Sequence, residues 1–318
     1  MFASVSAQMI VVHSQSSYEL SLNRTTVSTG TCMSPPTNFD LATATDQTLL
    51  SYGLPRRPVG SKADVAYWAD VIRHAKHRYC EVGSSENGQS YIEPRTSWAS
   101  GSTTSFNWAG YVAYATSAFT LVQGKWVVPC YVGSGWSHAE AVTWVGLGGF
   151  PSLPLWQGGT TEDKPEGYHF WWELYPNVNI QKLQYPAITC GDQVYVEADW
   201  NVNYSGKDYI VLLDMSTGQY TSVTDNVRPG QSTAEWIDER PGCGNGHLYD
   251  YQDVNPVYHY GSNATQGSGY YNISGWSNDA VTMVEQYDYY PLAIPTSLGS
   301  GGDNFWDDWN YDGNDWTC

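Results

Sequence analysis

Two short stretches of the sequence place glutamate side chains among aromatic rings. In Phe170-Trp-Trp-Glu-Leu-Tyr175, the alternation of side chains along a strand would put Glu173 on one face together with Trp171 and Tyr175. In Glu235-Trp-Ile-Asp-Glu239, it would set both glutamates opposite the tryptophan and the aspartate. A carboxyl group on the floor of a cleft can pass a proton to or from a substrate. Because a glutamate on a strand is more often a solvated surface residue, these stretches alone do not identify a site.

The motifs of several other enzyme classes are missing from the sequence. It contains no nucleophile elbow, HExxH helix, P-loop or glycine-rich dinucleotide turn, so serine-hydrolase, zincin and nucleotide-dependent mechanisms lack their residues. The six cysteines include no CxxC pair and no other metal-ligand spacing, which disfavours a zinc site. The remaining candidates for chemistry are carboxyl and amide groups among aromatic side chains.

Five stretches, in this order, resemble the motifs of the glutamic peptidases, the eqolisin family (peptidase family G1). They are Asn107-Trp-Ala-Gly110, Lys125-Trp-Val-Val-Pro129, Thr143-Trp-Val-Gly-Leu-Gly-Gly149, Leu155-Trp-Gln-Gly-Gly159 with Tyr168-His-Phe-Trp-Trp-Glu-Leu-Tyr-Pro176, and Ala234-Glu-Trp-Ile-Asp-Glu239. Each motif alone is weak, but five with the family's order and spacing are hard to obtain by chance. We identify the chain as a bacterial-type member with an N-terminal propeptide.

The resemblance implies an all-β fold, a two-sheet antiparallel β-sandwich that is concanavalin A-like (lectin-like). A peptide substrate would bind across the concave face of one sheet. Carried over position by position, the resemblance implies that Gln157 is the catalytic glutamine and Glu239 the catalytic glutamate. It implies no metal and no organic cofactor.

The chemistry suits this pair of side chains. A glutamate with a reference pKa near about 4.3 can deprotonate a water molecule that attacks the peptide carbonyl, and can then protonate the leaving amine. The amide of Gln157 offers N–H groups to the developing oxyanion, a role typically worth about 2.7 to 4 kcal/mol. Unlike a second carboxylate, an amide adds no like charge that would raise the pKa of Glu239.

Further residues of the cleft follow from the same motifs. Trp144 matches a tryptophan near the active site of the family, and Glu173 matches an acidic neighbour. Trp171 and Tyr175 share the face of Glu173, so we expect all four side chains to bind substrate. Trp144 could also serve packing, and Glu173 could simply hold a neighbour by hydrogen bonding.

The chain departs from the family pattern at acidic positions. Gly148 stands where the fungal form has an aspartate, and His169 stands where an aspartate is usual. Thr161 stands where an acidic residue is expected, unless Glu162 or Asp163 replaces it. With fewer carboxylates near the pair, the pKa of Glu239 should rise less. We therefore expect a pH optimum that is acidic but not strongly depressed.

The elements that must position these residues are short β runs, which follow one another after Asn107. Gly, Asn, Asp and Pro separate the runs, and turn sequences occupy residues 203–206 and 216–218. A series of short β runs separated by turn residues favours an antiparallel sandwich or barrel over an α/β fold. The clearest runs are residues 141–146, 168–175, 193–200, 209–214, 235–239 and 281–286.

A small segment with one α-helix precedes the β region. Apolar residues at helical spacing and a capping box of Ser61 and Asp64 predict this helix at about 62–79. We divide the chain into a propeptide (residues 1–100), a β-sandwich peptidase domain (101–297) and a Gly/Asp/Trp-rich tail (298–318). The tail could bind a cation or cover a sheet edge, but a solvated terminus is the simpler expectation.

The predicted helix is basic, whereas residues 98–318 carry the whole excess of acidic residues and with it the formal charge of −18. Attraction between the two is expected near neutral pH. We hypothesise an inhibitory propeptide that is released when acid protonates the carboxylates and charges His74 and His77. The alternative is an integral N-terminal domain.

The acidic surface repels phosphate backbones and anionic membranes, so we expect a protein or peptide substrate, no nucleic-acid partner and no membrane partner. We also expect a monomer. Two cysteines fall in the leading segment and four after it, so each part could close its own disulfides, with three pairings open for the latter. The cysteines and the chemistry indicate a secreted protein, although Met9–Val12 is too short for the apolar region of a signal peptide.

Two other functions remain open from the residues. One is a carbohydrate-binding module or lectin, suggested by the sandwich type and by the 25 tyrosines and 15 tryptophans. The other is a glycoside hydrolase that uses Glu173 and Glu239 as acid and base. A binder should tolerate loss of Gln157, and a glycosidase should cleave glycans but not casein.

Overall fold

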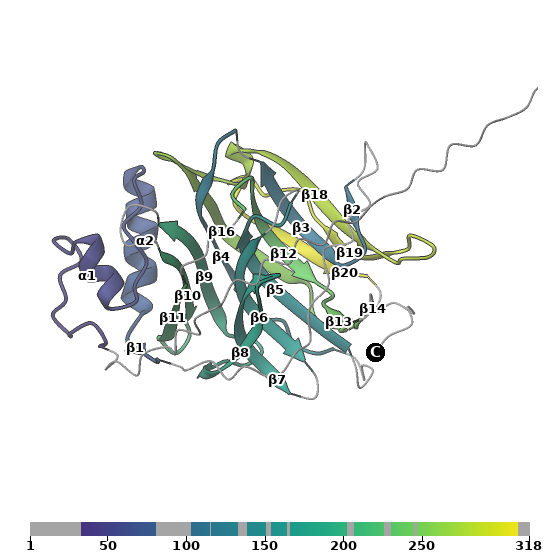
Figure 1. Cartoon of the computed structure of the whole chain (residues 1–318), viewed down its shortest axis with the longest axis horizontal. Helices are drawn as coiled ribbons and strands as arrows, with labels where there is room; N and C mark the ends of the chain where they lie inside the picture. Colours follow the sequence, from purple (N-terminus) through teal and green to yellow (C-terminus); the bar gives the residue numbers. More distant parts are fainter. Residues whose placement is uncertain are drawn as a thin grey trace, which may run out of the picture.

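A computed structural model describes residues 33–80, 103–114, 116–132, 139–150, 154–163, 166–201, 207–225, 230–244 and 247–310 (Figure 1). The turn expected at 203–206 lies outside these ranges. Within them, no helix combines the length and the apolar character needed to cross a membrane.

Short strands dominate the described chain. Its helices are α1 (Asp46–Ser51), α2 (Lys62–His74) and the 3-10 helix η1 (Ile273–Gly275). Its strands are β1 (His77–Arg78), β2 (Thr104–Ser105), β3 (Trp108–Tyr114), β4 (Phe119–Val127), β5 (Ala139–Leu147), β6 (Leu155–Asp163), β7 (Gly167–Tyr175), β8 (Val178–Ala187), β9 (Gln193–Asn201), β10 (Lys207–Asp214), β11 (Gln219–Asp225), β12 (Thr233–Glu239), β13 (Gly242–Gly244), β14 (His247–Leu248), β15 (Asp250–Tyr251), β16 (Val257–Gln266), β17 (Gly269–Asn272), β18 (Ser277–Val284), β19 (Pro291–Pro295) and β20 (Phe305–Trp309). Each β run expected from the sequence lies in one of these strands, although β18 ends at Val284 rather than at residue 286.

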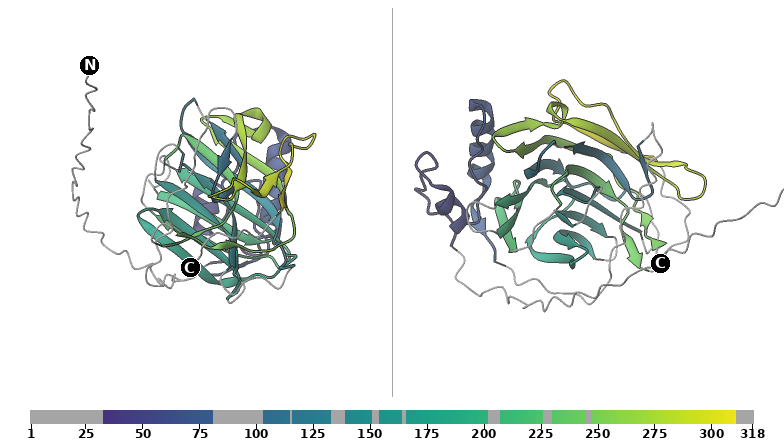
Figure 2. Two further views of the ribbon diagram at one scale, coloured as in Figure 1. Left: turned by 90° about the vertical axis from the view of Figure 1, so that its right-hand side faces the viewer. Right: turned by 45° about the horizontal axis from the view of Figure 1, so that its top comes forward.

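The strands form two curved layers (Figure 2). The front sheet has the order β18-β3-β12-β5-β6-β7-β8, and neighbours in it are antiparallel. The back sheet has the order β19-β20-β16-β4-β9-β10-β11, also antiparallel. Strand β18 pairs first with β3 and then with β19, which makes the hydrogen bonding continuous between the layers. The predicted all-β sandwich is confirmed.

Alternation along the strands divides the front sheet into two apolar faces. Trp156, Phe170 and Trp236 point between the layers, into the main core. In this core Trp236 Nε1 donates to the carbonyl of Gln123 at 2.8 Å, whereas Trp156 Nε1 has no hydrogen-bond partner in the described part of the chain. Trp144, Trp171 and Ile237 form a second cluster on the outer face. The two alternating stretches therefore present the faces that the sequence predicted.

Helix α2 begins as predicted and ends earlier. The side chain of Ser61 accepts from the amide of Asp64, and Asp64 accepts from the amide of Ser61, which completes the capping box. The prediction to residue 79 was wrong because His77 and Arg78 form β1, which pairs with β11. Tertiary pairing overrides the helical pattern there. Helix α1, capped by Thr45, was not expected.

The described part of the leading segment packs on the outer face of the back sheet, beside β10 and β11 (Figure 1). Trp68, Val71 and Ile72 of α2 join a core cluster with Tyr195, Leu213 and Tyr220 of the sheet. Burial of these side chains provides most of the attachment. The expected electrostatic attraction comes from Arg56, before the helix, whose guanidinium binds both oxygens of Asp199.

The tail expected as a solvated terminus is partly built into the fold. Residues 305–309 form β20 between β16 and β19, with Phe305 and Asp307 buried. That expectation was wrong for these residues, and residues 311–318 lie outside the described chain. Cys130 and Cys190 form a disulfide, one of the possible pairings of the later cysteines. Cys80 and Cys243 are also in disulfides.

Many carboxyl groups are buried in the sandwich. Glu162 and Glu235 are each fully buried, and burial raises the pKa of both well above the usual 4.5. The folded protein therefore binds protons at these groups more tightly than the unfolded chain does. Their contribution to stability is complete in acid and is lost as the pH rises through the folded-state pKa values.

We predict that the melting temperature falls by at least about 5 °C between pH 4 and pH 8, because several buried carboxyl groups must lose protons. Differential scanning calorimetry of the full chain across this range measures the change. A melting temperature that rises over the same range would contradict the reasoning.

Candidate active site

Glu239 ends β12 on the outer face of the front sheet, and hydrogen bonds fix both of its carboxyl oxygens. Trp144 Nε1 on β5 donates to Oε2 at 2.8 Å, and Asn107 Nδ2 donates to Oε1 at 3.0 Å. All three side chains are buried. The carboxyl group is thus held in one orientation by two donors, one from β5 and one from the residue before β3.

Gln157 lies on β6, on the same face. Its Nε2 donates to Glu173 Oε2 on β7 at 2.7 Å, across a register in which the two residues are direct partners. Gln157 Oε1 and Glu173 Oε1 have no hydrogen-bond partner in the described part of the chain. Glu173 therefore fixes one N–H of the amide, and the second N–H remains available to another group.

The sheet register brings the two expected catalytic residues to one face. Trp144 on β5 pairs with Ile237 on β12 and with Gly159 on β6, so it occupies the strand between Gln157 and Glu239. A side chain at Gly159 would meet the carbonyl of Thr143 at 1.9 Å. Glycine at this position thus allows β5 and β6 to approach beside the Trp144 ring.

The other expected site residues share this face. Trp171 belongs to the buried outer cluster with Trp144, and Tyr175 packs against that cluster. The structure therefore brings together all six residues that the sequence selected, and two of them, Trp144 and Glu173, also position neighbours. It does not test the catalytic roles of Gln157 and Glu239.

The enclosed face changes the acidity of both glutamates. Burial raises the pKa of Glu239 to about 8, against the opposing effect of the hydrogen bonds from Trp144 and Asn107. Burial also raises the pKa of Glu173 to about 8, and the charge of Glu239 adds to that shift. The sequence reasoning considered only neighbouring carboxylates, of which Glu140 is the last cause of the shift, and left out burial, which is the largest.

The sequence reasoning missed two residues that act on Glu239. The sequence analysis included Asn107 in a motif but gave it no role. In the structure, Ser105 Oγ donates to Asn107 Oδ1 at 3.0 Å and so directs the amide nitrogen of Asn107 toward Glu239. Glu140 on β5 adds to the rise in the pKa of Glu239 and accepts from the hydroxyl of Thr161 at 3.1 Å. Since Glu140 lies on another strand, no local spacing could have linked it to Glu239.

The departures from the family pattern have structural reasons. Gly148 has φ +90°, and a side chain there would meet the carbonyl of Gly230 at 2.4 Å, so an aspartate does not fit. Neither neighbour replaces the acid missing at Thr161. Glu162 faces Thr160, whose hydroxyl donates to it at 2.9 Å, and Asp163 binds Lys182 at 3.0 Å. The acidic group beside Thr161 is Glu140, which accepts from the Thr161 hydroxyl and shares Lys182 with Asp163.

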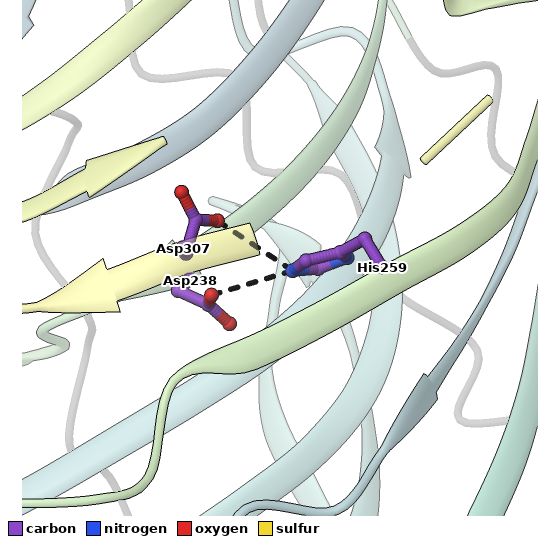
Figure 3. A group of neighbouring side chains, drawn as sticks. All are labelled: Asp238, His259 and Asp307. Carbon is purple, nitrogen blue, oxygen red and sulfur yellow. Dashed lines mark hydrogen bonds and ion pairs between the residues drawn. The ribbon is translucent and has the colours of Figure 1, made fainter. Parts of the chain in front are cut away.

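One cluster on the opposite face of β12 has ligand atoms suited to a metal ion (Figure 3). Asp238, His259 and Asp307 are buried, and their ligand atoms lie within 4.8 Å of one another. His259 Nε2 lies 3.3 Å from Asp238 and 3.6 Å from Asp307. A proton on Nε2 and a metal ion would compete for this position. The cluster faces away from Glu239 and ties β12 to β16 and β20.

Comparison with known proteins decides the family. The model of the Peptidase A4 family matches residues 106–296, more than half of the chain. The chain belongs to the Peptidase A4 family. It is a glutamic endopeptidase, as its motifs predicted.

Solved structures share the fold of this peptidase. Scytalido-glutamic peptidase, solved with a transition state analog inhibitor, has 18% sequence identity and a TM-score of 0.55, with 64% of this chain and 98% of that chain covered. SCP-B, a member of the eqolisin family solved with the tripeptide Ala-Ile-His, has 19% identity and a TM-score of 0.52, with the same coverage. No curated protein matches the chain.

We predict that Asn107→Ala lowers kcat for casein by about tenfold or more, because Glu239 loses one of the donors that fix it. That donor also lowers the pKa of Glu239, so the acid limb of the pH profile should move to higher pH. Asn278→Ala is the control, since Asn278 bonds only backbone carbonyls of Ile273 and Trp276 in the described chain. Equal kcat values and pH profiles for Asn107→Ala and the wild type would refute the role.

Proposed function

We propose that this peptidase hydrolyses peptide bonds in acid, with Glu239 as the base and then the acid and Gln157 as the oxyanion donor. The ionised carboxylate of Glu239 takes a proton from a water molecule as its oxygen attacks the scissile carbonyl carbon. The free N–H of Gln157 stabilises the oxyanion of the tetrahedral intermediate. Glu239 then returns the proton to the amine as the C–N bond breaks.

The separate anchoring of the two side chains carries this proposal. Glu239 receives hydrogen bonds from Trp144 and Asn107, and the amide of Gln157 is oriented by Glu173. Neither group depends on the other for its position, so a substrate and a water molecule could enter between them. Preorganised groups of this kind need no rearrangement as charge develops.

Action in acid requires an uncovered cleft. While Glu239 is buried with a pKa of about 8, it is protonated near neutral pH and cannot act as a base. Burial is the largest cause of this shift, so exposing the cleft to water should return the pKa toward 4.5. The carboxylate would then form in the acid range.

We infer that the leading segment, residues 1–100, is a propeptide that is removed before the enzyme acts. Its described part, residues 33–80, packs on the back sheet and not on the catalytic face. Inhibition would therefore not come from direct contact of α2 with Glu239. Protonation of Asp199 in acid would break its ion pair with Arg56 and weaken the attachment.

The localisation, oligomeric state and partners of the enzyme are part of the same proposal. We propose a secreted monomer that acts on protein or peptide substrates and binds neither nucleic acid nor membranes. The formal charge of −18 supports this set of partners.

The function is tested by digesting casein at pH 4 with wild type, Gln157→Ala and Glu239→Gln. We predict a loss of about 10²- to 10³-fold in kcat for Gln157→Ala. Glu239→Gln removes the only proton acceptor of the mechanism and should leave no measurable cleavage. Retained cleavage by either variant, or faster digestion by the wild type at pH 7 than at pH 4, would reject the mechanism.

The propeptide is tested by incubating the purified full chain at pH 4. We predict that the wild type shortens by about its first 100 residues as activity appears, while Glu239→Gln stays at full length. Gel electrophoresis and N-terminal sequencing follow the cleavage. A fully active wild type that keeps its full length would show that the segment is an integral domain.

A further inference from the structure

One row of side chains crosses the front sheet at the position of Gln157. In the sheet register, Glu235 on β12 pairs with Gly146 on β5, Gly146 with Gln157 on β6, and Gln157 with Glu173 on β7. Gly146 has no side chain, and Leu155 and Trp144 fill the space above it: a Cβ there would meet Leu155 Cδ1 at 2.8 Å and Trp144 Cζ3 at 2.9 Å. Glu235 and Gln157 thus lie two strands apart on the same face, on either side of this apolar filling.

Glu235 is on the catalytic face. Its neighbour two residues on, Ile237, belongs to the outer cluster, whereas Trp236 belongs to the core between the layers. Strand alternation therefore places Glu235 with Ile237 and Glu239. It lies four positions before Glu239 along β12, at the Gln157 end of the site.

The carboxyl group of Glu235 lacks partners. The side chain has 0% exposure, and neither oxygen has a hydrogen-bond partner in the part of the chain that the structure describes. The hydroxyl of Thr233, two residues earlier on the same face, is near enough to lower the pKa of Glu235, but it donates its single proton to the carbonyl of Phe150 at 2.7 Å. A buried polar group without a partner costs about 1 to 3 kcal/mol, so its retention on this face points to a missing ligand.

We propose that Glu235 is a substrate-binding residue, a neutral carboxyl group that donates a hydrogen bond to a main-chain carbonyl of the bound peptide. The proposal rests on the proposed peptidase mechanism and extends it by one residue. A peptide that crosses the sheet along this row would lie on the Trp144 ring and Leu155, between Glu235 and Gln157. The scissile carbonyl would meet Gln157, and a neighbouring carbonyl would meet Glu235.

The neutral form is the one that can donate. Burial raises the pKa of Glu235 well above its usual value in the covered protein. At pH 4 the group stays mostly protonated even when the open cleft returns its pKa toward the usual 4.5. An ionised carboxylate could only accept, and a peptide carbonyl would not bind to it. Glu235 is therefore suited to substrate binding in acid, whereas Glu239 has donors on both oxygens and is suited to form a carboxylate.

The test compares Glu235→Ala with Glu235→Gln at pH 4, on an internally quenched peptide taken from a casein fragment that the wild type cleaves. Alanine removes the donor and should lower kcat/KM about tenfold, mainly through KM. Glutamine keeps an N–H donor of the same reach and should stay within about threefold of the wild type. Melting curves establish that each variant is folded at the assay temperature.

Glu162→Ala is the matched control, because Glu162 is also fully buried on the front sheet but belongs to the opposite face of β6. It should lower the melting temperature and leave kcat/KM unchanged. An unchanged kcat/KM for Glu235→Ala, or a loss for Glu235→Gln as large as for alanine, would overturn the proposal. If the wild type cleaved no casein in acid, the proposed function itself would fail, which is a distinct result.

Discussion

A carboxyl group removed from water remains charged only if cations or hydrogen-bond donors replace the water that it loses. In this protein Glu235 has neither and Glu162 has one hydroxyl donor, from Thr160 on its own strand, and burial raises the pKa of both well above the usual value. Glu239 and Glu173 differ, because each accepts a hydrogen bond from a neighbouring strand. Buried carboxyl groups with few donors stay protonated and stabilise the fold in acid. The carboxyl groups of the cleft have donors that support an ionised form, and one of them can therefore act as the base.

The front sheet performs two tasks because its strands have two faces. Trp236 and Asp238 of β12 point toward the back sheet, where Asp238 meets His259 and Asp307. Glu239, the next residue, points to the cleft and receives the indole N–H of Trp144. A shift of β12 by one residue would exchange these faces and destroy both clusters. The buried Asp–His–Asp cluster, together with the Thr143 hydroxyl that donates to Asp238 at 2.6 Å, therefore helps to fix the register on which the cleft depends.

Sequence patterns predicted the features of the fold that depend on residues close together in the chain. The capping box at Ser61 and the faces of residues 170–175 and 235–239 followed from hydrogen bonding and strand periodicity, and the ordered motifs selected Gln157 and Glu239. Features that depend on distant partners were not predictable. Helix α2 ends early because residues 77–78 pair with β11, and β20 is buried because it pairs with β16 and β19. The acidity of Glu239 depends on how completely the face is covered, which no stretch of sequence encodes by itself.

The same contacts weigh against the two rival functions. Glu173 and Glu239, which a glycoside hydrolase would use as acid and base, both lie within residues 106–296, which match a peptidase family. A lectin needs open ring faces, but Trp144 and Trp171 are buried in the outer cluster. Glu173 has a simpler role in a peptidase. An amide can present either its oxygen or its nitrogen, and the bond from Gln157 Nε2 to Glu173 fixes the nitrogen side toward the carboxyl group. The second N–H on that nitrogen then has a defined direction, which an oxyanion donor requires.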